Sequence, residues 1–254
     1  MFSTQRTPQW HIDRRGKVTA SVCGTIIGVN KHQSAESMWK EQVGINKPFK
    51  GNFFTEYGTN NEPNALNEYS IQTGNHVEEV GFVVHPRYKW LGGSPDGLVH
   101  SDGVVEFKCP WPKAKNMYTT DTLPLHYFVQ CQVLMEVTNR AWCDLFVWTP
   151  DESRRWRFNR DPCFFALICP VLASYHAKIT LRDPTGDAPP TLDTVSKKMQ
   201  HAFVHKVLLD CLVAPNPETT RLFSEKEGGT WKTTDKGDSK RCKLSASPSQ
   251  QEQP

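Results

Sequence analysis

Residues 93–108 read GSPDGLVHSDGVVEFK, a stretch with the pattern of a β-hairpin. Two runs rich in apolar and β-branched residues, at 97–100 and 104–108, flank a Ser-Asp-Gly triplet that is typical of a hairpin turn. We therefore expect two neighbouring strands that run antiparallel and form part of a larger β-meander.

Charged residues follow a regular pattern on this hairpin. Side chains alternate between the two faces of a strand, so Glu106 and Lys108 share one face while Phe107 points into the core. Asp96 lies at the turn of the neighbouring strand, across the hairpin from Glu106. The spacing predicts that two carboxylates and one ammonium group meet at one point. An exposed Glu–Lys pair on a surface hairpin is the alternative.

A divalent cation explains why two carboxylates would lie side by side. Burying Asp96 next to Glu106 is unfavourable unless a cation lies between them. Mg²⁺ or Mn²⁺ takes oxygen ligands and keeps several waters, and Glu62 and the main-chain carbonyl of Phe107 are further candidate ligands. Lys108 would then orient and polarise a water at the cation against a phosphorus atom. This set is the minimal equipment for phosphodiester hydrolysis.

The rest of the chain alternates between helical and strand patterns. Apolar periodicity with capping residues predicts helices, and β-branched runs between turn residues predict strands. We expect helices from Val18 to Gly28 and at 54–73, 123–137 and 162–180, and strands at 76–85, 90–96, 97–100, 104–108 and 142–149. This order predicts an α/β protein with a mixed sheet and helices on its faces.

Composition limits the class of protein. The chain has 254 residues, of which 37% are hydrophobic and 22% charged, as is typical of a soluble protein with a sizeable core. Because no apolar run suits a membrane span or a secretory signal, and the eight cysteines form no CxxC pair, we expect an intracellular chain with reduced thiols, in cytoplasm or nucleus. We expect a folded domain at 1–223, with a Pro/Gly-rich loop at 182–193, and a disordered tail at 224–254.

Charge is unevenly distributed, although the formal net charge is only +3. Residues 1–50 contain eight Lys or Arg and three Asp or Glu, a balance of +5, whereas residues 51–106 contain two and eight, a balance of −6. A basic surface suits a nucleic-acid backbone, and an acidic pocket suits a hard cation. Chance placement on a solvated surface is the alternative explanation.

Five short blocks stand in a fixed order along the chain. They are Trp10 with Arg14-x-Gly16-x-Val18-Thr19-Ala20-Ser21, Gly58-x-x-x-Glu62, Ser94-Pro95-Asp96-Gly97, Glu106-Phe107-Lys108-Cys109-Pro110 and Tyr127-x-x-Gln130-x-Gln132. In order and spacing they resemble the phage lambda exonuclease and YqaJ viral recombinase family of PD-(D/E)XK nucleases. The resemblance covers the chain from about Trp10 to about His176 and implies a restriction-endonuclease-like fold, with a mixed β-sheet core flanked by α-helices.

The resemblance also implies roles around the hairpin. Asp96, Glu106 and the Phe107 carbonyl would be ligands of Mg²⁺ or Mn²⁺, with Glu62 completing the metal site. Lys108 would be the catalytic lysine.

Further roles are implied outside the hairpin. Gln130 would position the lysine, the water or the scissile phosphate, whereas Gln132, about 200° away on the same helix, is expected to pack or to hydrogen-bond a loop. Arg14 and Ser21 would hold the 5′ phosphate of DNA, with Arg15 as the alternative to Arg14. A guanidinium near a helix N-terminus suits this role, because free N–H groups add to its charge.

The activity implied is that of a Mg²⁺-dependent deoxyribonuclease, a 5′-to-3′ exonuclease acting on double-stranded DNA ends in recombination or repair. A structure-selective or nicking endonuclease of the same superfamily and a non-catalytic DNA-binding recombination protein are the alternatives. The expected partners are DNA and a single-strand annealing protein, with no membrane. Because lambda-type members form ring-shaped trimers, a homotrimer is implied as well.

Overall fold

The computed structural model describes residues 5–111, 118–181 and 197–213. The expected loop at 182–193 and the expected tail at 224–254 lie outside the described residues. The helices are α1 (Pro8–Arg14), α2 (Ala20–Ile26), α3 (Ala35–Gln42), α4 (Phe53–Thr73), α5 (Leu125–Thr138), α6 (Pro162–Leu181) and α7 (Lys197–Cys211). The strands are β1 (Val18–Thr19), β2 (Val77–Glu78), β3 (Val83–Val84), β4 (Leu91–Gly93), β5 (Gly97–Val99), β6 (Gly103–Lys108), β7 (Trp142–Trp148) and β8 (Ser153–Asn159).

The strands form two mixed sheets. The larger sheet has the order β2-β5-β6-β7-β8, in which only the central pair, β6 and β7, is parallel. The smaller sheet has the order β1-β4-β3, with β1 parallel and β3 antiparallel to β4. The mixed α/β fold expected from the sequence is therefore confirmed, and the predicted hairpin is the β5–β6 pair.

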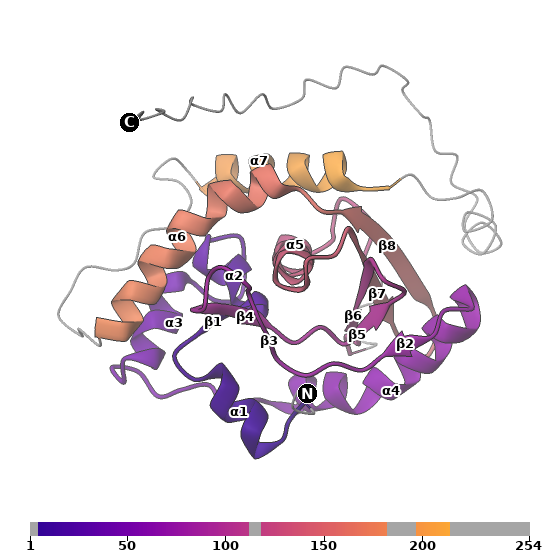
Figure 1. Cartoon of the computed structure of the whole chain (residues 1–254), viewed down its shortest axis with the longest axis horizontal. Coiled ribbons are helices and arrows are strands. Elements are labelled where there is room, and N and C mark those ends of the chain that lie inside the picture. Colours follow the sequence, from indigo (N-terminus) through magenta and orange to yellow (C-terminus); the bar gives the residue numbers. More distant parts are fainter. Residues whose placement is uncertain (1–4, 112–117, 182–196, 214–254) are drawn as a thin grey trace, which may run out of the picture. The chain divides into compact units, whose positions relative to one another are not determined.

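Helices cover both faces of the larger sheet (Figure 1). Val105 and Phe107 of β6 belong to an apolar cluster with Tyr69 of α4, whereas Val104 belongs to the main core together with Phe128 of α5. This is the two-residue alternation expected of a strand that is buried on both faces. Because of it, Glu106 and Lys108 face α5 and not α4.

Two glycines permit close approaches that position α5 and β5. A Cβ added to Gly24 of α2 would lie 2.5 Å from the His126 Cβ of α5, and one added to Gly97 would lie 2.0 Å from Cγ1 of Val77 in β2. Real Cβ atoms are not found so close to another carbon, so α2 can pack on α5, and β2 on β5, only because these positions lack a side chain.

The expected strand at 76–85 is wrong, because the chain changes sheets within it. β2 pairs with β5 of the larger sheet, whereas β3 pairs with β4 of the smaller one. The segment between them, residues 79–82, crosses from one sheet to the other. The expected helix from Val18 is also shorter than predicted, because Val18 and Thr19 pair with β4 before α2 begins at Ala20.

The helix α6 is long and apolar enough, by length and composition alone, to be a candidate membrane span, which the sequence did not lead us to expect. One such helix is weak evidence, since core helices of soluble proteins pass the same test. Its buried side chains belong to the main core, and Tyr175 donates a hydrogen bond to Gln42 of α3 at 2.7 Å. The seven described cysteines are free thiols, as expected.

A buried carboxylate joins α4 to the far half of the sheet. Asp144 of β7 is fully buried and accepts hydrogen bonds from the Tyr69 hydroxyl at 2.7 Å and from Nε and Nη2 of Arg157, both at 2.7 Å. Paired, charge-assisted hydrogen bonds of this kind compensate the cost of burying the charge.

Asp144→Ala is therefore expected to lower the free energy of unfolding by about 1–3 kcal/mol, because it leaves the buried Tyr69 hydroxyl without its acceptor, whereas water can partly solvate the half-exposed Arg157. Urea unfolding monitored by circular dichroism measures the effect. The exposed Asp151→Ala serves as the control and should change stability by less than about 0.5 kcal/mol. Equal midpoints for the two variants would show that the buried pair does not hold the sheet to α4.

Candidate active site

Glu106, Lys108 and Gln130 form a closed hydrogen-bonded triangle between β6 and α5. The Lys108 ammonium donates to Glu106 Oε1 at 2.8 Å and to Gln130 Oε1 at 3.1 Å, and Gln130 Nε2 donates to the same Glu106 oxygen at 2.6 Å. Glu106 is 3% exposed, so its charge is held by these two neighbours in a largely water-free setting. The structure thus brings together three of the residues predicted from the sequence.

Asp96 lies beside this triangle, just before β5. Its Oδ2 accepts a hydrogen bond from the Phe107 main-chain N–H at 2.7 Å, and this contact fixes the carboxylate to the middle of the E-x-K strand. The prediction that Asp96 lies across the hairpin from Glu106 is confirmed, because Gly97 pairs with Val105.

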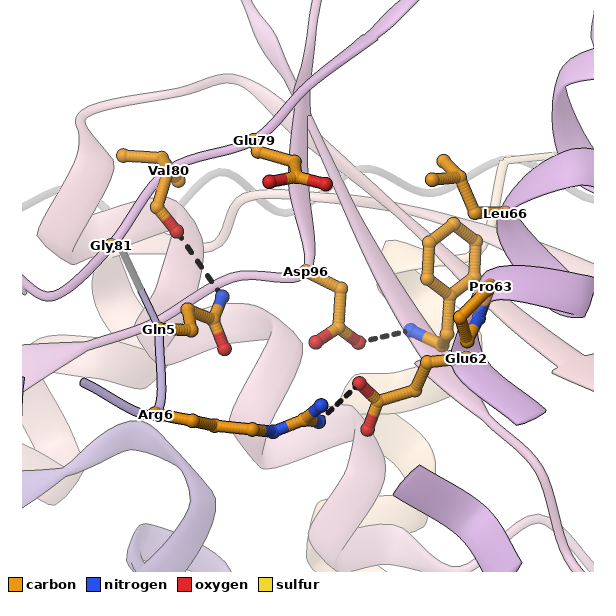
Figure 2. Close-up of a pocket in the computed structure, with 10 residues that line it drawn as sticks. Gln5, Arg6, Glu62, Pro63, Leu66, Glu79, Val80, Gly81 and Asp96 are labelled. Carbon is orange, nitrogen blue, oxygen red and sulfur yellow. Dashed lines mark hydrogen bonds and ion pairs between the residues drawn. The ribbon is translucent and has the colours of Figure 1, made fainter. Parts of the chain in front are cut away.

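A pocket of about 450 Å³ opens in front of Asp96 (Figure 2). Glu62 of α4, Phe107 of β6 and Glu79, from the segment that crosses between the sheets, also line it. Figure 2 shows the Glu62 carboxylate on the side toward which the Asp96 carboxylate points, whereas the Glu79 carboxylate lies on the other side of the Asp96 backbone. Three acidic side chains from three separate segments therefore line one pocket.

Burial and mutual repulsion shift the titration of these carboxyl groups. Burial raises the pKa of Asp96 well above its usual value, and the neighbouring charges of Glu106 and Glu62 raise it further. Burial also raises the pKa of Glu106, although Lys108 and Gln130 offset part of the rise by binding its charged form. The site therefore holds more negative charge than its own cations neutralise.

Lys108 is held as an ammonium ion. Burial alone would lower its pKa, but the charges of Glu106 and Asp96 and the hydrogen bond to Glu106 raise the pKa above the usual lysine value. The ammonium also lies 5.0 Å from the centre of the Tyr127 ring, a distance that suits a cation–π contact. A protonated Lys108 can orient a water or a phosphate oxygen, but it has no lone pair with which to accept a proton.

The residues present fit a divalent cation. Glu106 Oε2 is buried and has no hydrogen-bond partner among the described residues, which is unusual for a buried carboxylate oxygen. A hard cation would supply that partner and would offset the repulsion that raises the pKa of Asp96. In the described part of the chain, however, no three His, Cys, Asp or Glu side chains are gathered tightly enough to form a complete metal site. Glu62 is instead ion-paired with Arg6.

The two predicted phosphate-binding residues lie at different helix ends, Arg14 at the C-terminus of α1 and Ser21 at the N-terminus of α2. Arg14 is the last residue of α1, and its guanidinium carbon lies 4.1 Å from the centre of the Trp10 ring. Trp10 Nε1 donates to the Ser94 hydroxyl at 2.8 Å, so the Arg14–Trp10 stack is joined to the Ser-Pro-Asp-Gly turn. Ser21 lies in the first turn of α2 and is exposed.

The expectation that Arg14 or Arg15 combines with helix N–H groups stays a prediction. Gly16 adopts a φ of +67° and turns the chain after α1, so β1 comes between Arg14 and the start of α2. A guanidinium stacked on an aromatic ring still presents its N–H edge for an oxyanion.

Gln132 has the structural role that was expected. Its side chain donates to the Asn159 carbonyl at 2.8 Å and accepts from the Asp161 N–H at 2.9 Å, which ties α5 to the loop after β8. Sequence reasoning missed Gln5, Arg6 and Glu79 at the pocket. Glu79 was hidden inside an expected continuous strand, and no residue pattern marked Gln5 and Arg6.

Residues 9–141, just over half of the chain, match the model of the YqaJ-like viral recombinase domain. The chain belongs to this family.

Individual relatives show how far the likeness extends. The chain is 31% identical to the alkaline exonuclease LHK-Exo of Laribacter hongkongensis, with a TM-score of 0.57 over 69% of this chain and 93% of that one. It is also 24% identical, over 172 residues, to an uncharacterized protein of Acanthamoeba polyphaga mimivirus, and 23% identical, over 128 residues, to YqaJ of Bacillus subtilis. These matches cover 62% and 49% of this chain but only 31% and 40% of those two relatives.

Removing the Asp96 charge is expected to stabilise the protein in EDTA. Because the folded-state pKa is raised, ionisation of Asp96 destabilises the fold as pH rises through that pKa. Asp96→Asn should therefore unfold roughly 2–4 °C higher than the wild type at pH 8, a gain of about 1 kcal/mol. The difference should shrink as pH falls.

Thermal unfolding in EDTA, at pH 8 and at successively lower pH, measures the difference in unfolding temperature. Asp151→Asn serves as the exposed control. A lower unfolding temperature for Asp96→Asn than for the wild type at every pH would mean that Asp96 is a structural carboxylate.

Proposed function

We propose that this chain is a divalent-cation-dependent DNA nuclease that degrades double-stranded ends in the 5′-to-3′ direction. The observation that carries the proposal is the hydrogen-bonded triangle of Glu106, Lys108 and Gln130 next to Asp96. Membership of the YqaJ-like viral recombinase domain family supports it. So does the likeness to LHK-Exo, an alkaline exonuclease that was also crystallised with dAMP, a nucleoside monophosphate of the kind that stepwise DNA cleavage releases.

Asp96, Glu106 and the Phe107 carbonyl would hold Mg²⁺ or Mn²⁺, with Glu62 completing the site, and the cation would polarise the scissile phosphate and ease deprotonation of the attacking water. The triangle of Glu106, Lys108 and Gln130 would position the reacting groups. An ammonium has three N–H donors, and Lys108 uses two of them on Glu106 and Gln130. We infer that the third N–H is directed at a phosphate oxygen or the attacking water. We also infer that Gln130 fixes the positions of the Glu106 and Lys108 side chains relative to each other.

Arg14 supports the proposed polarity. Its stack on Trp10, and the hydrogen bond from Trp10 to Ser94, fix a guanidinium near the turn that carries Asp96. A 5′ phosphate bound there would set the distance from the strand end to the scissile bond. Ser21 is the proposed second contact. A partner annealing protein and a ring-shaped homotrimer remain predictions from the family.

The direct test is digestion of a linear duplex carrying 5′ phosphates and 3′ labels, with Mg²⁺ or with EDTA. We expect cation-dependent loss of the linear strand, no cutting of closed circles, and at least a hundredfold slower digestion by Lys108→Ala, since a lost transition-state contact costs about that much. Cutting of circles would favour the endonuclease alternative. Retained DNA binding without cutting, with Mg²⁺ or Mn²⁺, would make the chain a non-catalytic binding protein.

The 5′-phosphate pocket is tested by comparing Arg14→Ala with Arg15→Ala. The wild type should digest 5′-phosphorylated duplex faster than 5′-hydroxyl duplex. Arg14→Ala should remove about tenfold of that preference, the amount expected for one charge-assisted contact. Initial rates on the two substrates measure the ratio. If Arg15→Ala removes the preference and Arg14→Ala keeps it, the assignment passes to Arg15.

A further inference from the structure

The segment before α1 lies across the acidic pocket in a fixed position. Gln5 Nε2 donates to the main-chain carbonyl of Val80 at 3.1 Å (Figure 2) and to that of Pro95 at 2.8 Å. Two residues later, Thr7 caps α1 by accepting the Trp10 N–H. Arg6, between these anchors, has a φ of +66°, a conformation that non-glycine residues seldom adopt. The anchors on either side therefore determine where the Arg6 side chain can reach.

Arg6 is the sole positively charged residue among the described residues that line the pocket, whereas Glu62, Glu79 and Asp96 are acidic. Its guanidinium forms an ion pair with Glu62 Oε2. The two side chains are 51% and 31% exposed. Exposed ion pairs contribute little to stability, so the guanidinium can leave Glu62 at small cost.

The Arg6 guanidinium and the proposed divalent cation compete for the Glu62 carboxylate. Glu62 is a proposed ligand of the divalent ion, and an oxygen engaged by a guanidinium is not free to bind that ion. A bound divalent ion also places two positive charges near Arg6, which favours movement of the guanidinium to another acceptor. A DNA phosphate entering the pocket offers two oxygens in the geometry that a guanidinium fork matches.

We propose that Arg6 is a DNA-phosphate-binding residue with two alternative partners. It pairs with Glu62 when the cation is absent and with a backbone phosphate of the bound strand when the cation is present. The inference rests on the proposed nuclease function and deepens it, because it makes cation binding and DNA binding cooperative: the cation competes with Arg6 for Glu62 and thereby frees Arg6 for the DNA phosphate.

Two opposite effects of Arg6→Ala follow. Without DNA, the variant should bind the divalent cation about two- to fivefold more tightly than the wild type, because Glu62 loses its competing partner, an effect within the usual range of coupling between sites. With the cation present, the variant should bind DNA about five- to tenfold more weakly, the loss expected for one hydrogen-bonded charge contact. A residue that only supported the fold would not strengthen cation binding.

The experiment measures both affinities on the full chain. Titration calorimetry with Mn²⁺ gives the cation affinity without DNA. Fluorescence anisotropy of a labelled duplex, in Ca²⁺ and in EDTA, gives the DNA affinity, and a gel confirms that the DNA stays intact. The variants are Arg6→Ala, Arg6→Lys and the control Lys40→Ala, which removes an equal charge from an exposed pair with Glu36 on α3.

In Ca²⁺ we expect weaker DNA binding by Arg6→Ala, with a salt dependence reduced by about one released counterion. Arg6→Lys should be intermediate, because it keeps the charge but not the fork. In EDTA the loss should fall below about twofold, because Glu62 already neutralises Arg6 in the wild type. Lys40→Ala should match the wild type throughout.

Unchanged DNA affinity of Arg6→Ala in Ca²⁺, with a wild type that binds and cuts DNA, would overturn this inference and leave the proposed function standing. An equal loss in Ca²⁺ and EDTA would overturn the exchange of partners. The Glu62→Gln background adds a further check. If Arg6→Ala has no effect on DNA binding there, Arg6 serves only to place Glu62. A wild type that neither binds nor cuts DNA would instead refute the proposed function.

Discussion

The excess of negative charge at the β5–β6 hairpin is the constraint on which the rest of the site depends. Glu106 is buried, Asp96 is fixed to the Phe107 N–H, and Glu62 is close enough to raise the pKa of Asp96. Like charges placed so close in a poorly hydrated setting repel each other unless positive charge joins them. Lys108 supplies part of that charge, and Glu106 Oε2 finds no hydrogen-bond partner in the described part of the chain, so the compensation there is incomplete.

Packing around β6 and α4 holds these charged side chains in place. Alternation along β6 sends Phe107 into the cluster below α4 and Glu106 toward α5, so one strand anchors itself in apolar packing and presents its charges at the same time. Asp144, which does not line the pocket, joins α4 to β7 through Tyr69 and Arg157 and thereby keeps the helix that carries Glu62 on the sheet. A site built on helices and a central strand is held more precisely than one built on loops.

Sequence reasoning located Asp96, Glu106 and Lys108 because short-range rules govern them, and Gln130 because of the resemblance to the family. Hairpin geometry and strand alternation place the first three, and the Y-x-x-Q-x-Q block places the fourth. Contacts that join distant segments escaped prediction. Glu79 reached the pocket because the chain changes sheets after β2, and Arg6 because Gln5 binds the Pro95 carbonyl ninety residues away. No local sequence pattern in 76–85 or near the N-terminus predicts these contacts with distant segments. The later start of α2 escaped prediction for the same reason, since pairing of Val18 with Leu91 inserts a strand ahead of the helix.

The central claim is that Asp96 and Glu106 bind one divalent cation. Anomalous diffraction at the manganese edge, from crystals soaked in Mn²⁺, tests it most directly. We expect a peak between these two carboxylates and the Phe107 carbonyl, within about 2.0–2.3 Å of each oxygen, as hard-cation ligation requires. An empty site at millimolar Mn²⁺, with Glu106 and Asp96 in their present positions, would contradict it.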